Sequence, residues 1–417
     1  MPGPLQGLRV LDLSRVLAGP WSMQTFGDMG ADIIKIERPG FGDDSRHWGP
    51  PWLADGEGKP TRESAYFLST NRNKRSVAID ITVAEGQRLV RDLTAHCDVF
   101  IENFKRGSMA RFGLDYESIR KVRPDIIYLS LTGFGQEGPF ADRPGYDYLF
   151  QGLGGVMSVT GERDDLPGGG PQRVGVPLVD LFTGMYSSIA ILAALNHRNN
   201  TGEGQLIDLS LFDTVLALSS GQLSNYFVSG KVPPRTGTAS PNIAPYGVFP
   251  ASDGDLIVAS ANQSQWVAFC KVLGLEWMAT DPRFATNAGR IANYAEMHEL
   301  CSESTRRRTR TEWEELMTEA GVPAGPINDY SQAIEHPQAK FRGSRLAIDH
   351  PLGGKAPGVA SPLRFSKTPV SYRMAPPLLG QHTYEVLREQ LALDEAALEK
   401  LAAAGVIADA AKASSRA

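Results

Sequence analysis

The sequence predicts an α/β protein in which a large domain, built on a doubly wound parallel sheet, carries a smaller inserted α+β domain. Three observations support this class. Strand-like and helix-like segments alternate over residues 1–131, as they do in βαβ units. The 417 residues are too many for one compact core, so we expect two domains. Beyond residue 240 the pattern changes, because a hairpin signal at Asp253-Gly254 is followed by helical segments.

The first βαβ unit is predicted at the start of the chain. Residues 8–13 form a strand, a helix opens at Pro20 and ends at Gly30, and residues 31–37 form the second strand. The turn after the first strand lacks the GxGxxG fingerprint of dinucleotide-binding proteins. This absence argues against a nicotinamide-dependent dehydrogenase.

The alternation continues through the rest of the large domain. Further strands are predicted over residues 76–81, 98–103 and 125–131. Thr82 and Glu85 have the spacing of a capping box, which predicts a helix to about residue 95. Residues 38–70 are rich in Gly, Pro, Trp and charge, and we expect a long loop that lines a functional site.

Asp180 is a lone carboxylate in an apolar run that predicts a buried helix. Pro177 suits the first helical position, and the helix dipole with its free N–H groups would help to keep Asp180 ionised. Gly184, one turn later, would leave space for a ligand to approach. Such a residue is either a hydrogen-bonding member of a core helix or a functional carboxylate, and the run alone leaves both interpretations open.

Gly- and Pro-rich linkers at residues 229–234 and 321–326 suggest the domain boundaries. Residues 1–228 would form the first part of the large domain and residues 229–326 the small α+β domain. Residues 327–417 would return to the large domain.

Composition excludes several classes of function. The net charge of −5 argues against nucleic-acid binding and against general attraction to anionic membranes. The three widely spaced cysteines suggest neither a disulfide framework nor a thiolate metal site. No apolar run approaches the ~18 residues of a membrane span, and residues 1–7 do not resemble a signal peptide. We therefore expect a cytoplasmic protein with no membrane, nucleic-acid or metal partner.

Several segments, in this order and spacing, resemble the class III CoA-transferases, the family of formyl-CoA transferase and carnitine CoA-transferase. The resemblance spans essentially the whole chain. The matching segments are RVLDLSRVLAGP (9–20), GADIIKIERPG (30–40), NKRSVAIDI (73–81), DVFIENF (98–104), PGYDYLFQGLGG (144–155), the run 175–184 around Asp180, GEGQLIDL (202–209) and PPLLGQHTYEVL (376–387).

The resemblance implies an enzyme with Asp180 as its nucleophile. This carboxylate would attack an acyl-CoA to form a mixed anhydride, and an aspartyl-CoA thioester would then pass CoA to a carboxylic acid. The resemblance further implies a Rossmann-like CoA-binding large domain and an interlocked homodimer. It implies no cofactor beyond the CoA of the substrate.

The resemblance also implies contacts with CoA, residue by residue. They are Leu17, Ala18, Arg38, Ile79, Asp80, Asn103, Arg111, Tyr146 and Asp147. Leu17 stands where the formyl-CoA enzyme has glutamine, and RTGTASPN (235–242) occupies the region of its tetraglycine loop, so formyl transfer is not expected. Similarity to dicarboxylate-using members makes a C4 to C6 dicarboxylate such as succinate or glutarate the expected acceptor.

Arg46 is the residue proposed to contact the acceptor carboxylate, because a guanidinium matches a carboxylate in shape and charge. An ion pair with Asp43 or Asp44 is the alternative for this arginine.

Two alternative functions remain open from the sequence. An α-methylacyl-CoA racemase would need a histidine where this chain has Tyr146, and a tyrosine with a pKa near ~10 is a poor base at neutral pH. A non-catalytic CoA-binding subunit is the other alternative, and the presence of Asp180 argues against it.

Overall fold

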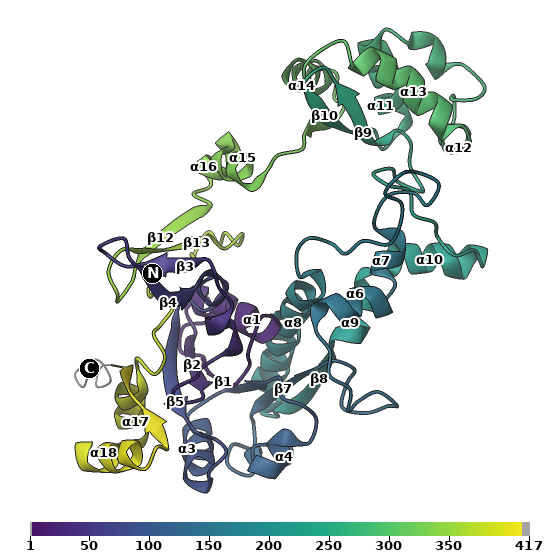
Figure 1. Cartoon of the computed structure of the whole chain (residues 1–417). Coiled ribbons are helices and arrows are strands. Elements are labelled where there is room, and N and C mark those ends of the chain that lie inside the picture. The colour runs from purple at the N-terminus through teal and green to yellow at the C-terminus, as the bar shows by residue number, and fades with distance from the viewer. Residues whose placement is uncertain (1, 411–417) are drawn as a thin grey trace. The chain divides into compact units, whose positions relative to one another are not determined.

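The computed structural model describes residues 2–410, and residues 411–417 of the predicted carboxyl-terminal segment lie outside them. The chain divides into two compact units. Within the described residues, unit 1 contains 2–154, 175–223 and 338–410, and unit 2 contains 155–174 and 224–337. Each unit is described by itself (Figure 1).

A seven-stranded sheet forms the centre of unit 1, in the order β14-β5-β2-β1-β6-β7-β8. All neighbouring pairs are parallel except β14 with β5 at one edge. The strands are β1 (Arg9–Asp12), β2 (Asp32–Glu37), β5 (Lys74–Ile79), β6 (Val99–Glu102), β7 (Ile127–Thr132), β8 (Gln205–Ser210) and β14 (Ile407–Ala408). The predicted parallel α/β sheet is confirmed.

Both faces of this sheet are buried beneath helices. Successive strand residues point to opposite sides of the sheet, so neighbouring residues join different cores. Val10 joins the core beneath α1 (Ala18–Asp28) and α8 (Leu178–Thr201), and Leu11 joins the core on the other face. The helices that contribute to that second core are α3 (Ala84–Thr94), α4 (Ser108–Phe112), α5 (Tyr116–Ile119), α17 (Thr383–Leu391) and α18 (Glu395–Ala403). The sheet is therefore doubly wound.

The strand order reverses between β1 and β6. From β1 the chain adds β2 and β5 on one side, and then β6, β7 and β8 on the other. Open α/β sheets bind ligands in the crevice at the carboxyl ends of the strands where the order reverses. This topology directs attention to the loops after β1 and β6.

Residues 38–70 contain regular structure where the sequence predicts one long loop. A hairpin of β3 (Trp52–Ala54) and β4 (Pro60–Ser64) lies between a 3₁₀ turn, η1 (Asp44–His47), and α2 (Ala65–Leu68). The hairpin is short and lacks clear alternation, so its sequence gave no strand signal.

The capping box predicted at Thr82 is wrong. The N-cap of α3 is Val83 and makes no side-chain cap, while the hydroxyl of Thr82 donates to the carboxylate of Asp80 at 2.6 Å.

Helix α8 is exposed along one side, contrary to the expectation of a buried helix. Its inner face packs on α1 and on the sheet, whereas Phe182, Met185 and Ile189 are exposed. In the described residues this one helix is long and apolar enough to span a membrane by length and composition alone, a test that the core helix of a soluble protein also passes. Exposed apolar faces of this kind often mark interaction surfaces.

Among its described residues, unit 1 contains three further helices or hairpins. They are α6 (Asp147–Leu153), α9 (Leu211–Leu218) and the hairpin of β12 (Arg345–Asp349) and β13 (Lys355–Val359). α10 (Ser220–Ser229) and α16 (Pro337–Phe341) lie across the boundaries between the two units.

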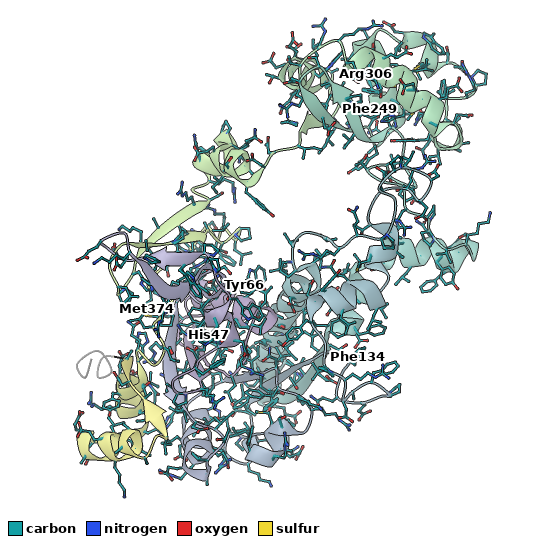
Figure 2. The ribbon with its side chains drawn as sticks, viewed as in Figure 1. His47, Tyr66, Phe134, Phe249, Arg306 and Met374 are labelled. Atoms are coloured by element: carbon teal, nitrogen blue, oxygen red, sulfur yellow. The ribbon has the colours of Figure 1, made fainter. Side chains whose placement is uncertain are left out.

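Unit 2 is a small α+β fold. Its antiparallel sheet has the order β11-β10-β9, from β9 (Tyr246–Ala251), β10 (Gly254–Ala259) and β11 (Ala324–Pro326). The hairpin predicted at Asp253-Gly254 is confirmed. Phe249, labelled in Figure 2, belongs to a core with Trp266 and Trp313. The helices are α7 (Val156–Val159), α11 (Gln263–Leu273), α12 (Asn287–Ala292), α13 (Tyr294–Thr305), α14 (Arg310–Glu319) and α15 (Tyr330–Glu335), with the 3₁₀ turn η2 (Glu276–Ala279).

The boundaries of the units differ from residues 229 and 327. Residues 155–174 belong to unit 2, because Arg235 binds the Ser158 carbonyl at 2.9 Å and pairs with Asp164. The predicted linker 321–326 includes β11, which adds the third strand to the sheet. Neither of these long-range pairings has a local sequence signal.

Candidate active site

Asp180 lies in the first turn of α8. Pro177 is the N-cap of this helix, whereas the sequence predicted it at the first helical position. The side chain is partly buried. Burial raises the pKa of Asp180 to about 7, and the negative charge of Asp147 adds to this shift. Asp180 is therefore poised to change its protonation state near neutral pH.

Asp147 explains why the helix terminus does not lower the pKa of Asp180. Its Oδ2 accepts the backbone N–H groups of Val179, at 2.7 Å, and Asp180, at 3.2 Å. These are the free N–H groups that we expected to help ionise Asp180. Oδ1 of Asp147 accepts from the Gln151 amide at 2.6 Å, so the buried carboxylate is held in place.

Asp180 opens onto a cavity of about 330 Å³ within unit 1. Its walls include the loops after β1 and β6 and the residues before α6. Of the predicted CoA contacts, Leu17, Ala18, Asn103 and Tyr146 line it together with Asp180. Four basic residues also line this cavity, namely Arg15, Lys105, Arg106 and Arg143. The surroundings therefore suit an acyl group beside Asp180 and a ligand with negative charges.

A second cavity, of about 310 Å³, adjoins the first. Both are lined by Arg15, Asp44 and Phe104. The predicted contacts Arg38, Ile79 and Asp80 line the second cavity. Together the two cavities follow the carboxyl ends of β1, β2, β5 and β6, where the strand order reverses.

Three predicted contacts have a different environment. Asp147 lines neither cavity, and its carboxylate instead accepts the N–H groups at the start of α8. Arg111 is exposed on α4 and lines neither cavity, although its neighbour Phe112 does. Asn103 faces the first cavity, but its amide already bonds the backbone of Arg15, accepting from N–H at 2.9 Å and donating to C=O at 2.8 Å. Its evident role is to hold the loop after β1.

Arg46 has a structural environment, and its predicted contact with the acceptor finds no support. The guanidinium is buried, forms a bidentate pair with Glu37 at 2.8 and 2.9 Å, and bonds Glu63 at 3.2 Å. It also lies 3.6 Å from the centre of the Phe67 ring. The ion-pair alternative is closer to the structure, but with partners other than Asp43 and Asp44.

Tyr66, which the sequence did not single out, lies within the electrostatic influence of Asp180. Burial raises the pKa of Tyr66 to about 12, and the charges of Asp180, Asp147 and Asp43 add to the shift. Its phenol therefore stays protonated, and its ring packs edge-on against Trp48, with the ring centres 5.0 Å apart. Figure 2 labels Tyr66. Both residues come from the segment predicted to line a site, and the two tryptophans of that segment were the only signal.

Gly184 does not open space for a ligand, as the sequence suggested. A Cβ at this position would lie 2.8 Å from the carbonyl oxygen of Ala18 and 3.0 Å from the Trp21 ring. The glycine instead lets α1 approach α8 closely, one turn beyond Asp180. Close packing of these helices places the loop after β1 opposite the carboxylate.

Among the described residues, no group of three His, Cys, Asp or Glu side chains is arranged to hold a metal ion. The three cysteines are buried and unpaired in disulfides. Burial raises the pKa of the Cys97 thiol to about 12, so this thiol is a poor nucleophile.

A sequence model of CoA-transferase family III matches residues 5–383. The chain belongs to this family. It is 46% identical over 386 residues to a succinate–glutarate CoA-transferase of Agrobacterium fabrum, covering 93% of this chain and 95% of the relative. It is 40% identical over 404 residues to a succinyl-CoA:glutarate CoA-transferase of Homo sapiens, covering 97% and 90%.

Solved structures agree with this assignment. A CAIB/BAIF family protein from Brucella suis is 45% identical, with a TM-score of 0.82, and the match covers 94% of this chain and 100% of that one. The family resemblance read from the sequence segments is confirmed. This family III CoA-transferase is therefore an enzyme.

Proposed function

We propose that this CoA-transferase moves CoA from succinyl-CoA to a dicarboxylic acid such as glutarate. The named activities of its relatives in Agrobacterium fabrum and Homo sapiens support this choice of substrates. The observation that carries the proposal is the position of Asp180, a partly buried carboxylate in the first turn of α8 that faces a cavity with basic walls. A carboxylate at such a place can act as a nucleophile toward a thioester.

The proposed reaction proceeds by acyl exchange on Asp180. The carboxylate attacks the thioester carbonyl, the C–S bond breaks, and CoA leaves as a thiolate, which gives a mixed anhydride. The thiolate then attacks the aspartyl carbonyl, which releases succinate and leaves an aspartyl-CoA thioester. The acceptor carboxylate attacks this thioester, the C–S bond breaks, and a second mixed anhydride forms between Asp180 and the acceptor. The released CoA thiolate attacks the acceptor carbonyl of this anhydride, which gives the new acyl-CoA and frees the Asp180 carboxylate. Every bond that breaks is matched by one that forms, so no cofactor beyond CoA is needed.

The surroundings of Asp180 favour this chemistry. Burial and the charge of Asp147 keep the pKa near 7, so the carboxylate is a stronger nucleophile than an exposed aspartate and is still substantially ionised at neutral pH. We assign the pantetheine arm to the cavity beside Leu17 and Ala18, and the nucleotide to the cavity beside Ile79 and Asp80. Arginines at these walls suit phosphate groups.

We propose that the exposed side of α8 is covered by a second copy of the chain. Phe182, Met185 and Ile189 form an apolar face, and Ile189 is 57% exposed. The exposed Tyr148 and Leu149 of α6 extend the apolar surface of unit 1. Analytical ultracentrifugation should find a dimer, and Ile189→Glu should weaken it. A wild-type monomer at micromolar concentration would contradict this assembly.

The decisive experiment incubates the purified enzyme with succinyl-CoA and a panel of carboxylic acids and detects new acyl-CoA by mass spectrometry. Glutaryl-CoA should form with the wild type and not with Asp180→Ala, which should still bind CoA. Asp329→Asn, a helix-capping aspartate of unit 2, is the matched control and should remain active. Deuterium uptake at the α-carbon without acid exchange would favour the racemase alternative, and full activity of Asp180→Ala would refute the nucleophile.

A further inference from the structure

Val16 has a backbone conformation that its side chain disfavours. Its φ is +73°, and it is one of three described non-glycine residues with positive φ, beside Asn73 and Ala392. A β-branched residue is a poor occupant of the left-handed region, so the surroundings must impose this conformation. Val16 lies in the loop between β1 and α1, and this loop lines the cavity of Asp180.

Asp43 holds Val16 in this conformation. Its carboxylate accepts the Val16 backbone N–H at 3.1 Å through Oδ1 and 3.3 Å through Oδ2. Lys35 fixes the carboxylate from the other side, with Nζ 2.9 Å from Oδ2, and also donates to the Ser14 carbonyl at 2.8 Å. The side chains of Lys35 and Asp43 are fully buried. One buried ion pair therefore anchors both ends of the turn.

The carboxylate of Asp43 remains ionised despite its burial. Burial alone would raise the pKa of Asp43, but the Lys35 ammonium and the hydrogen bonds from Ser45 outweigh it and hold the pKa below its ordinary value. The N–H and the hydroxyl of Ser45 both donate to Oδ1, at 3.0 and 2.8 Å. Asp43 thus presents a fixed, charged acceptor to Val16.

Asp12 and Asn103 hold further backbone groups of the turn. Asp12 at the end of β1 accepts from the N–H of Ser14 at 2.9 Å, and Asn103 after β6 bonds both backbone groups of Arg15. The turn leads directly to Leu17 and Ala18, and the Ala18 carbonyl lies against Gly184 of α8. The conformation of Val16 therefore sets where this wall of the cavity stands relative to Asp180.

We propose that the buried Lys35–Asp43 pair is a positioning device that locks Val16 in the left-handed conformation and so presents Leu17 and Ala18 to the CoA thioester in front of Asp180. This inference rests on the proposed function, because it takes Leu17 and Ala18 as contacts of CoA. Asp43 and Lys35 line the second cavity and not the cavity of Asp180. They act through the backbone of the turn.

The test first removes the charge of Asp43 and then replaces Val16 by residues that adopt positive φ with less strain. Asp43→Asn should weaken CoA binding, measured by calorimetry, by about tenfold, with a similar loss in kcat/KM for transfer. Adding Val16→Gly should restore several-fold of the lost affinity, because glycine adopts positive φ without strain, and Val16→Ala should restore less. A role in stability alone would restore Tm in the order Gly, Ala, Val without restoring CoA affinity.

Ala392→Gly provides the matched control, since Ala392 has φ +53° at the end of α17 and lines neither cavity. In the Asp43→Asn background it should relieve strain without restoring CoA affinity. Equal rescue by Ala392→Gly, or no rescue by Val16→Gly, would overturn the inference. If Asp43→Asn cannot be purified, Ser45→Ala, which removes one hydrogen bond to Asp43, should give the same order with smaller effects.

The two proposals fail in different ways. A wild-type enzyme that neither binds CoA nor transfers it would contradict the proposed function. A wild-type enzyme that does both, with no dependence of the Asp43→Asn defect on the residue at position 16, would contradict only the positioning role.

Discussion

Asp147→Asn should shift the pH dependence of the enzyme toward acid. The carboxylate of Asp147 caps the start of α8 and adds its charge to the burial that raises the pKa of Asp180 to about 7. An asparagine keeps one oxygen to accept the N–H groups of Val179 and Asp180 but carries no charge. The Gln151 amide can turn to offer its oxygen to the new NH₂ group, so the local packing is retained.

The size of the shift follows from the two causes of the raised pKa. Burial, the larger cause, remains in the variant, so the pKa of Asp180 should stay above its ordinary value. Loss of one neighbouring charge should lower it by about one unit, equivalent to about 1.4 kcal/mol. At pH 5.5 the ionised fraction would rise from about 3% to about 24%, an increase of about eightfold. Above pH 8 both enzymes would be almost fully ionised.

The assay is kcat/KM for succinyl-CoA with glutarate between pH 5 and 9. Normalised to its value at pH 8.5, the rate of Asp147→Asn at pH 5.5 should exceed that of the wild type by about eightfold. Asp329→Asn removes the charge of another helix-capping aspartate, in unit 2, and should leave the profile unchanged. An unchanged profile for Asp147→Asn, or a shift toward alkaline pH, would refute the assignment of Asp147.

Three further predictions concern stability. Asp180→Asn should raise the free energy of unfolding by on the order of 2 kcal/mol at pH 8 and hardly change it at pH 4. The reason is that the raised pKa of Asp180 makes folding less favourable as the pH rises from about 4 to about 7. Calorimetric unfolding at both pH values measures this, and an equal stabilisation at the two pH values would contradict it. Gly184→Ala should lower Tm and kcat/KM by pushing α1 off α8, whereas Gly221→Ala, with open space at its Cβ, should not. Arg46→Met should lower the free energy of unfolding by about 3 kcal/mol, because it leaves the buried carboxylate of Glu37 without its ion-pair partner. A raised KM for glutarate with an unchanged Tm would instead support Arg46 as the acceptor contact.

The sequence predicted the sheet and the hairpin well, because their signals are local. Apolar runs such as residues 31–37 and 125–131 become buried parallel strands within one or two residues of their predicted bounds. Asp253-Gly254 between two apolar segments predicted the antiparallel pairing of β9 and β10. Periodicity and turn chemistry are sufficient for such elements.

What the sequence could not predict depends on partners distant in the chain. Nothing near Arg46 indicates that Glu37 and Glu63 enclose it. Asp147 lies 33 residues before Asp180, yet it takes the N–H groups that the helix start seemed to offer. Gly184 predicted an open space, and α1 fills it. In each case the residue type was informative, but its role was set by tertiary packing.

The central claim is that Asp180 becomes covalently modified during turnover. The most direct measurement is the mass of the peptide that carries Asp180, after quenching during turnover with succinyl-CoA and trapping with hydroxylamine. The wild type should give the aspartyl hydroxamate on that peptide, and Asp180→Asn should give none. Steady turnover with no modified Asp180 peptide at any time point would contradict the proposed chemistry.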